Sequence, residues 1–347
     1  MITAVDSTMR ILVIGGTRFL GPAVVARLAA AGHEITVFHR GQDEVEHHAG
    51  VSHLHGDRAR LVDFSHLFRL LAPDIVLDMA PYSEDDARQA VAAFRGVARR
   101  LVALSSQDVY RAYGRFHRNE AGPHEPIPYD EGAPLRERLY PYRGNGRGLD
   151  DYDKIPVERL VMSTPDLPGT VLRLPMVYGE RDYQRRLFIE LRRMDDGRPA
   201  ILVEETFAAW RWSRAYVENA AAAIALAVID DRAAGRVYNV GEVYALTYAE
   251  WLRAVAHAAG WPGEVVVVPD GTLPPSLRPP DGDYTQHLVA DTTRIRHELG
   301  FVEPMPREEA LRRAVAWERA QRAQDQPRPI DYSAEDALLA QLRAAPA

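Results

Sequence analysis

The feature that most constrains this chain is an apolar strand that breaks into glycines and leads directly into a helix-like segment. The strand reads RILVI, the turn after it reads GGTRFLG over 15–21, and the pattern of 22–31 is helical. Backbone amides at a helix N-terminus attract phosphate, and only glycine lets the main chain approach a pyrophosphate closely. Gly15, Gly16 and Gly21 stand where such a turn needs them. The segment therefore predicts a dinucleotide-binding turn, with an ordinary strand-to-helix connection as the alternative.

Short apolar strands and helix-like segments alternate along the first half of the chain. The expected elements are strands at 10–14, 34–38, 74–78, 100–104 and 170–174, and helices at 22–31, 84–95 and 151–163. This alternation predicts an α/β fold, a Rossmann-like, doubly wound parallel sheet with helices on both faces. Such a sheet binds ligands at the carboxyl ends of its strands. Residues 116–145, rich in Pro, Gly, Tyr and charge, predict a long loop over that edge.

The pattern loosens after Tyr178, which predicts a smaller C-terminal lobe for the substrate. The expected elements there are helices at 184–194, 215–229 and 247–259, and strands at 200–204 and 236–240. A proline-rich stretch at 268–283 predicts a loop. The expected organisation is a dinucleotide-binding domain at 9–178 with returning segments near 212–241 and 288–300, a lobe at 179–211 and 242–330, and a C-terminal tail or helix at 331–347.

Composition narrows the functional classes. At 347 residues with 46% hydrophobic content, the chain can bury a large core. It has no cysteine for disulfides, thiolate metal sites or nucleophilic catalysis, and its histidines lack metal-ligand spacing, so no metal is expected. The net charge of -7 gives no electrostatic footprint for nucleic acid. A polar start, MITAVDST, and the lack of a long apolar run predict a soluble, cytoplasmic protein with no membrane contact.

The glycine turn also carries a resemblance. GGTRFLG resembles the motif of the extended and atypical short-chain dehydrogenase/reductases, the NAD(P)-dependent epimerase/dehydratase family, in which glycines recur every third residue. Arg18 replaces the middle glycine, as in the atypical branch, which includes chloroplast stem-loop RNA-binding proteins alongside enzymes. The resemblance covers roughly 9–320 and implies a two-lobed protein with a small-molecule substrate and a homodimeric assembly. It assigns cofactor contacts to Gly15, Thr17, Arg18, Phe19, Leu20 and Gly21.

The end of the second strand bears on which cofactor binds. A strand that selects NAD usually ends in an acid that binds the ribose 2′-hydroxyl, whereas an arginine suits a 2′-phosphate. This strand ends in FHRG without an acid, so His39 and Arg40 are candidate contacts and NADP is the expected cofactor. The alternative is NAD, with a solvated Arg40. The resemblance assigns further contacts to Asp57, Arg58, Met79 and Ala80, and Asp57 is alternatively a turn former.

Catalytic candidates follow the strand expected at 100–104. The segment LSSQDVY resembles the family's strand-end motif, in which a hydroxyl four residues before a tyrosine binds the reacting oxygen. Ser106 falls on that position, and Asp108 stands where related dehydratases carry a glutamate that acts as acid or base. A hydroxyl at the carboxyl end of a parallel strand is well placed for this work. The alternative for Ser106 is a turn held by local hydrogen bonds.

The second half of the expected site departs from the family pattern. A tyrosine and a lysine one helical turn apart would let the ammonium lower the pKa of the phenol. Lys154 with Glu158 fits the family spacing, which implies a lysine that holds the nicotinamide ribose, and the alternative is a solvated lysine. Asp150 stands at the tyrosine position, and Tyr152 lies only two residues before the lysine. On a regular helix, two residues turn a side chain by about 200°.

Three solutions stay open. Asp150 is the base, or the helix begins late and leaves Tyr152 in an irregular turn, or a loop tyrosine, Tyr140 or Tyr142, reaches the site. The alternative for Asp150 and its neighbour Asp151 is capping of the helix.

The family segment LRLPMVYG has Met176 where relatives usually carry an asparagine that touches a substrate phosphate. Candidate substrate ligands, alternatively a solvated helix face, are Arg185, Arg186, Arg192 and Arg193. The resemblance thus implies an epimerase, dehydratase or reductase acting on a hydroxyl or keto carbon of a sugar nucleotide or a similar polyol. The alternative is a cofactor-binding protein without turnover, such as a sensor or an RNA-associated relative.

Overall fold

The computed structural model describes residues 8–42, 50–146, 148–325 and 330–344. Its centre is a parallel sheet in the order β10-β6-β5-β4-β1-β2-β3. The strands are β1 (Arg10–Ile14), β2 (Glu34–His39), β3 (Val51–His55), β4 (Ile75–Asp78), β5 (Arg100–Ser106), β6 (Gly169–Leu174) and β10 (Arg236–Asn239). The chain leaves β1 for one side of the sheet and returns to the other side at β4. In doubly wound sheets such a reversal marks the ligand-binding crevice, which is here expected at the carboxyl ends of β1 and β4.

Helices cover both faces of the sheet. Ile11 and Val13 belong to the hydrophobic core that includes α1 (Leu20–Ala30) and α8 (Val217–Ile229), which pack on each other. The alternate residues of the same strand, Leu12 and Ile14, belong to a separate core on the other face. The helices on that face are η1 (Arg58–Phe64), α2 (Ser65–Leu71), α3 (Glu84–Phe94) and α5 (Lys154–Met162). The strands read as continuous apolar runs because both of their faces are buried.

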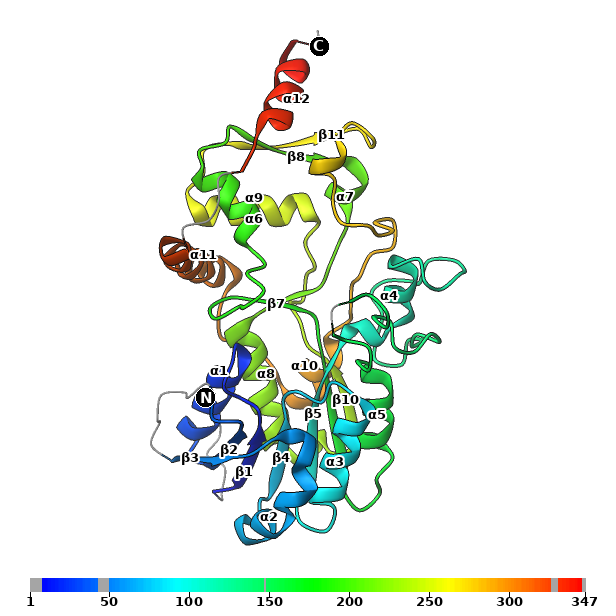
Figure 1. Ribbon diagram of the computed structural model, residues 1–347, viewed down its shortest axis with the longest axis vertical. Helices are drawn as coiled ribbons and strands as arrows, with labels where there is room; N and C mark the ends of the chain where they lie inside the picture. Colours follow the sequence, from blue (N-terminus) through cyan, green and yellow to red (C-terminus); the bar gives the residue numbers. More distant parts are fainter. Residues whose placement is uncertain (1–7, 43–49, 147, 326–329, 345–347) are drawn as a thin grey trace.

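The C-terminal lobe lies above the carboxyl edge of the sheet, with α12 at its far end (Figure 1). Two short parallel pairs build it: β7 (Met176–Tyr178) with β9 (Arg214–Tyr216), and β8 (Ala200–Glu204) with β11 (Glu264–Val268). Its helices are α6 (Phe188–Asp195), α7 (Glu205–Ala209), α9 (Tyr248–Ala259), α11 (Arg307–Asp325) and α12 (Ser333–Ala344). Across the residues that the structure describes, every helix is too short or too polar to cross a bilayer.

The doubly wound α/β fold predicted from sequence is confirmed. Three parallel pairings were not expected: β3 with β2, β11 with β8, and β7 with β9. The structure adds α2, α7, α11, α4 (Arg111–Phe116) and α10 (Thr293–Leu299) to the expected helices. It also adds the short helical turns η1, η2 (Gln107–Val109), η3 (Asp231–Ala233) and η4 (Pro275–Leu277). Among described residues, no helix or strand lies between α4 and α5, which matches the predicted long loop.

Candidate active site

The glycine turn, residues 15–21, connects β1 to α1 with a backbone that other residues would not tolerate. Gly15 and Gly16 have φ values of 86° and 83°, in the left-handed region that favours glycine. A Cβ on Gly21 would lie 2.2 Å from the backbone carbonyl of Gly16. The N-cap residue of α1, Phe19, makes no side-chain hydrogen bond to the start of the helix, so no side chain caps this helix end. This cradle fits the pyrophosphate of a dinucleotide.

The end of β4 lies directly beside the glycine turn. The backbone N–H of Met79 donates to Ile14 O at 3.1 Å, and a Cβ on Gly15 would come within 3.8 Å of the Met79 Cβ and 4.0 Å of the Ala80 Cβ. The structure therefore brings Met79 and Ala80 together with the turn. The remaining turn residues named as cofactor contacts are Thr17, Arg18, Phe19 and Leu20.

The end of β2 carries one buried and one exposed basic side chain. His39 is buried, and its Nδ1 accepts from the Gly41 N–H at 3.2 Å while its Nε2 lies 2.8 Å from Nδ1 of His53. Arg40 is exposed next to it. Because β2 is the neighbour of β1, Arg40 follows the strand that runs beside the glycine turn.

Asp57 and Arg58 follow β3 and already have partners in the protein. Asp57 caps η1 by accepting from the Ala59 N–H at 3.0 Å. Arg58 pairs with Asp78 at 2.6 Å and with Asp86. Burial raises the pKa of Asp78 and the Arg58 charge opposes that rise. Arg58 thus holds the end of β4 in place, a contact that the resemblance alone did not indicate.

Ser106 and Asp108 occupy the tight turn that follows β5. Ser106 Oγ accepts from the Asp108 N–H at 3.1 Å. The Asp108 carboxylate is buried, and its Oδ2 accepts from two phenols, Tyr152 at 3.0 Å and Tyr142 at 3.3 Å. Burial raises the pKa of Asp108, while the Arg136 charge and the Tyr152 hydrogen bond lower it.

Helix α5 begins later than predicted, at Lys154 rather than at residue 151. Asp153, not Asp150 or Asp151, is the N-cap, and its carboxylate accepts from the Ile155 N–H at 2.9 Å. Pro156 gives the physical reason, because proline is tolerated in the first turn of a helix but not in its interior. Tyr152 therefore precedes the helix, and the helical argument against its reaching the site does not apply.

The structure brings together two of the three solutions that the sequence left open. Tyr152, in its irregular turn, and the loop residue Tyr142 both reach Asp108, whereas the exposed Asp150 accepts from the Gly144 N–H at 2.6 Å, away from that cluster. Tyr140 contributes its backbone N–H to Asp153, and its ring lies under Arg143.

Lys154 is buried between the ends of β4 and β5. Its Nζ donates to Pro81 O at 2.8 Å and to Leu104 O at 3.1 Å. It lies 4.8 Å from the ring centroid of Tyr82 and 5.8 Å from that of Tyr152. Burial lowers the pKa of Lys154 to about 8, against the opposing charges of Asp78 and Asp108. It is the only lysine among 42 lysine and arginine residues, a signal in the sequence that marks this position as one needing an ammonium.

Both phenols stay protonated at neutral pH. Burial raises the pKa of Tyr152 and of Tyr142, and the nearby Asp108 carboxylate raises each further. A hydrogen bond with Ser106 partly opposes the rise at Tyr152. Each phenol is therefore a proton donor in this site rather than a ready base.

One helical turn beyond Lys154, Glu158 anchors α5 to the sheet. It accepts from Arg173 of β6 at 2.7 Å and from the Ser105 hydroxyl at 2.5 Å, and all three side chains are buried. The spacing from lysine to glutamate seen in the sequence thus has a packing function.

The arginines considered as substrate ligands are engaged within the protein. The ion pairs are Arg185 with Glu318, Arg186 with Asp182, Arg192 with Asp196 and Arg193 with Glu335. The alternative, a solvated helix face, is wrong for these four, because carboxylates of α11, α12, the loop before α6 and the residue that follows α6 hold them.

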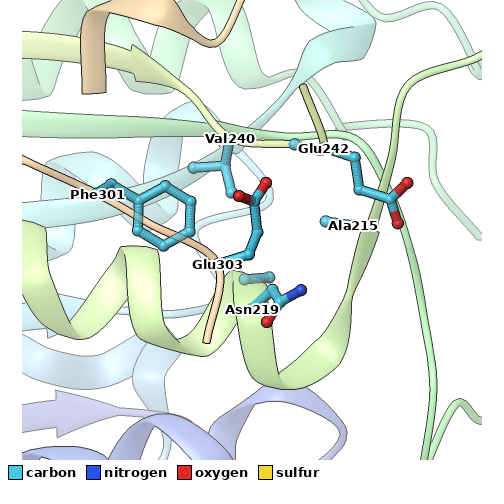
Figure 2. A pocket seen from close by; sticks show the side chains of 8 residues that line it. Ala215, Asn219, Val240, Glu242, Phe301 and Glu303 are labelled. Carbon is cyan, nitrogen blue, oxygen red and sulfur yellow. The ribbon is translucent and has the colours of Figure 1, made fainter. Parts of the chain in front are cut away.

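Two hollows lie outside the cluster of Ser106, Asp108, Tyr152 and Lys154. Figure 2 shows a narrow gap beside α8, where Asn219 exchanges two hydrogen bonds with the main chain of Met305. A second hollow, of about 250 Å³, is lined by Tyr110, Tyr129, Glu125 and three prolines. Within the described part of the chain, no three His, Asp or Glu residues are arranged to hold a metal ion.

The chain belongs to the NAD dependent epimerase/dehydratase family, whose model matches residues 11–241. It is similar to 2′-dehydrokanamycin reductase of Streptomyces kanamyceticus, with 28% identity over 268 residues, 76% of this chain and 70% of that one. It is also similar to the chloroplast stem-loop binding protein of 41 kDa b of Arabidopsis thaliana, with 22% identity over 322 residues, 85% of this chain and 75% of that one.

The fold matches the solved UDP-glucose 4-epimerase of Thermotoga maritima with UDP-glucose. The TM-score is 0.66 at 21% identity, over 90% of this chain and 99% of the other. The family predicted from the glycine turn is therefore confirmed, and with it an NAD-binding fold of the epimerase, dehydratase and reductase type.

Proposed function

We propose that this protein is an NAD(P)-dependent enzyme that reduces a ketone, or interconverts a hydroxyl carbon, on a sugar-like polyol. The observation that carries the proposal is the cluster at the end of β5, where Tyr152 donates to Asp108 beside Ser106 and Lys154. Such a cluster beside a dinucleotide cradle has the groups that hydride exchange at a carbinol or carbonyl carbon requires.

Each side chain has a role that its surroundings support. Bound NAD(P) would supply the hydride chemistry, held by the glycine turn, Met79, Ala80 and Lys154. Ser106 holds the reacting oxygen, and Tyr152 gives that oxygen a proton, since its phenol is neutral in this site. Asp108 orients the Tyr152 hydroxyl by accepting its hydrogen bond, as it also does for Tyr142, and the proton that Tyr152 gives up is replaced from solvent after each turnover. A protonated tyrosine favours ketone reduction as the direction of reaction.

The charge distribution of the lobe favours a polyol over a sugar nucleotide. A diphosphate needs arginines that are available to it, yet Arg185, Arg186, Arg192 and Arg193 are paired with carboxylates. Met176 stands where relatives carry a phosphate-contacting asparagine. The similarity to a reductase of an oxidised kanamycin points the same way.

For the cofactor we propose NADP, with NAD as the alternative. Arg40 is exposed after the strand beside the glycine turn, and that strand ends without an acid. An arginine at this place suits a 2′-phosphate. A cytoplasmic location and a homodimer remain predictions of the sequence.

The first experiment titrates the purified protein with NAD, NADH, NADP and NADPH by thermal shift and calorimetry. Ligands that bind the folded state raise the melting temperature by mass action. We expect binding, tighter for the NADP forms. NADPH is then incubated with 2′-dehydrokanamycin while the absorbance of the reduced nicotinamide is followed. NAD is incubated with UDP-glucose and the sugar products are separated by chromatography, because an epimerase regenerates its cofactor and gives no net absorbance change. Turnover of the first probe supports the proposal, and turnover of UDP-glucose alone overturns the substrate class.

The competing function is an RNA-associated protein without turnover, which the similarity to the chloroplast stem-loop binding protein brings into consideration. The assembled cluster of Ser106, Asp108, Tyr152 and Lys154 favours the enzyme. An RNA shift assay at increasing salt separates the two, because binding driven by phosphate contacts weakens steeply with salt. Salt-sensitive RNA binding without binding of any nicotinamide cofactor would overturn the enzyme proposal.

A further inference from the structure

A buried ion pair joins the long loop to the start of α5. Arg136 Nη2 lies 3.1 Å from Asp153 Oδ1, and the side chains are 2% and 0% exposed. Burying two charges costs several kcal/mol per ion, which attraction offsets only when the geometry is good and the remaining polar atoms are satisfied. We therefore looked for the structural role that offsets the cost of burying this ion pair.

The remaining polar atoms of both side chains are satisfied, and their partners lie in separate segments. Arg136 donates from Nε to Asp108 O at 2.5 Å and from Nη1 to Arg138 O at 2.7 Å. Asp153 accepts from the Ile155 N–H at 2.9 Å and from the Tyr140 N–H at 2.6 Å. The pair thus ties the turn after β5, the long loop and the helix start to one another.

Asp153 stands between Tyr152 and Lys154 in the sequence. Its own N–H donates to Tyr82 O at 3.0 Å, so both its main chain and its side chain are held. With Asp153 fixed, Tyr152 is directed to Asp108 from one side and Lys154 to the carbonyls of Pro81 and Leu104 from the other. Tyr152 and Lys154 thus reach the same site although they lie only two residues apart, whereas on a regular helix a spacing of four residues would place them on one face.

We propose that Arg136 and Asp153 are positioning residues, whose ion pair holds Tyr152 and Lys154 in register with Asp108 and sets the charge around the Asp108 carboxylate. The inference rests on the proposed function, in which Tyr152 and Asp108 act on the substrate. Neither member of the pair touches the reacting atoms in that mechanism.

The two members act on Asp108 with opposite sign. The Arg136 charge lowers the pKa of Asp108 and the Asp153 charge raises it. The other groups that face Asp108 are Tyr113 of α4, Tyr142 of the long loop, Tyr152 before α5 and Lys154 within it. These residues are not themselves substituted in variants of the pair, so the direct charge effect of removing Arg136 or Asp153 has a direction that is known beforehand.

The test compares Arg136→Gln, Asp153→Asn and the double variant, all in the full chain. The pKa of Asp108 is read by carboxyl ¹³C NMR of aspartate-labelled protein, with the signal assigned by its loss in Asp108→Asn. We expect the pKa of Asp108 to rise in Arg136→Gln and to fall in Asp153→Asn, with the double variant between them. Asparagine still caps a helix, so the Asp153 variant keeps the start of α5. The matched control is the exposed pair of Arg143 and Asp151 on the same loop, whose neutralisation should leave the pKa of Asp108 unchanged.

The position of Lys154 is measured separately, by the NMR signal of its side chain. Labelled lysine gives one side-chain signal, which the rings of Tyr82 and Tyr152 shift while Lys154 stays in place. Arg136→Lys keeps the charge but not the planar fork of donors, and it adds a second lysine signal, which is identified because it persists in Arg136→Lys/Lys154→Met. We expect this variant to leave the pKa of Asp108 near that of the wild type while it moves the Lys154 signal and lowers kcat. This variant decides the question if Arg136→Gln does not fold.

Shifts of equal sign in the two single variants, or an unmoved Lys154 signal in Arg136→Lys, would overturn the inference. The NMR readouts need no substrate, so a protein that turns over neither probe still tests the pair. Conversely, normal turnover without these shifts would reject the pair and leave the proposed function standing.

Discussion

The two sides of the crevice are built in different ways. On the cofactor side, the glycine turn is a continuous segment of seven residues whose function lies in its backbone. On the catalytic side, the side chains come from the turn after β5, the long loop and the start of α5, up to 48 residues apart between Ser106 and Lys154. The comparison teaches that local sequence can specify a backbone cradle, whereas a side-chain cluster depends on how distant segments are held.

The largest expected effect is on the catalytic side. Tyr152→Phe removes the hydroxyl that donates to Asp108, and we expect a loss of about 10²-fold or more in kcat, the usual contribution of a general acid. The measurement is oxidation of NADPH with whichever probe the wild type turns over. Tyr140→Phe is the control, because the ring of Tyr140 lies under Arg143 and its main-chain N–H donates to Asp153, a bond that the substitution keeps. Equal losses in both variants would mean that the loop as a whole, not the Tyr152 hydroxyl, carries the effect.

On the cofactor side, we expect the largest effect from a substitution that disturbs the backbone of the glycine turn. Gly21→Ala places a Cβ 2.2 Å from the Gly16 carbonyl, and we expect a destabilisation of about 3 kcal/mol, the upper range for overpacking. Binding of NADPH should weaken at least as much. Urea unfolding and calorimetry measure the two effects. Gly241→Ala is the control, since its Cβ would meet no atom closer than 3.4 Å. Unaltered cofactor affinity in Gly21→Ala would contradict the cradle.

Lys154 belongs to both the cofactor side and the catalytic side of the proposed site. Its titration should have a smaller effect, on the free energy of unfolding. Its pKa is lowered to about 8 in the folded protein and returns to about 10.4 on unfolding. Between these values the unfolded chain binds a proton that the folded protein does not, so the free energy of unfolding rises with pH, by at most about 1.4 kcal/mol per unit. Lys154→Met should lack this rise. Parallel pH dependences of the two proteins in urea unfolding would show that Lys154 is not perturbed.

The smallest expected effect concerns cofactor choice. Arg40→Ala should reduce the preference for NADPH over NADH by about tenfold, the scale of one charge-assisted contact at an exposed side chain. Calorimetry with both cofactors measures the ratio. Arg60→Ala serves as an exposed control farther along the same edge, after β3. A preference that survives in Arg40→Ala would assign selection to another group.

Sequence patterns predicted most of the sheet because each strand carries its own apolar run. The strands at β1, β2, β4, β5, β6 and β10 lie within two residues of the expected bounds. The sequence patterns did not predict β3. Its sequence, VSHLH, has little apolar content, and the strand forms by pairing with the edge of β2. Position along the chain gave no hint of that pairing.

The candidate site was only partly visible. Ser106, Asp108 and Lys154 could be named from local motifs, but Asp150 was a candidate only while the helix was taken to begin at residue 151. Two signals in the sequence could have helped. Pro156 indicates that α5 begins late, and Lys154 stands out because it is the only lysine of the chain. Arg136 gave no signal, since an arginine in a loop of mixed charge looks like any solvated side chain.

The sequence by itself determined the class of fold, the position of the glycine turn and the family. These depend on short-range rules: apolar periodicity, helix termini, and the glycines that a backbone approach demands. Only the tertiary structure decided how Tyr152 reaches Asp108, which carboxylates hold the arginines of the lobe, and that Arg136 and Asp153 meet in the interior. Those outcomes depend on contacts between distant segments, where burial strengthens the electrostatic interactions and leaves no room for an unsatisfied partner.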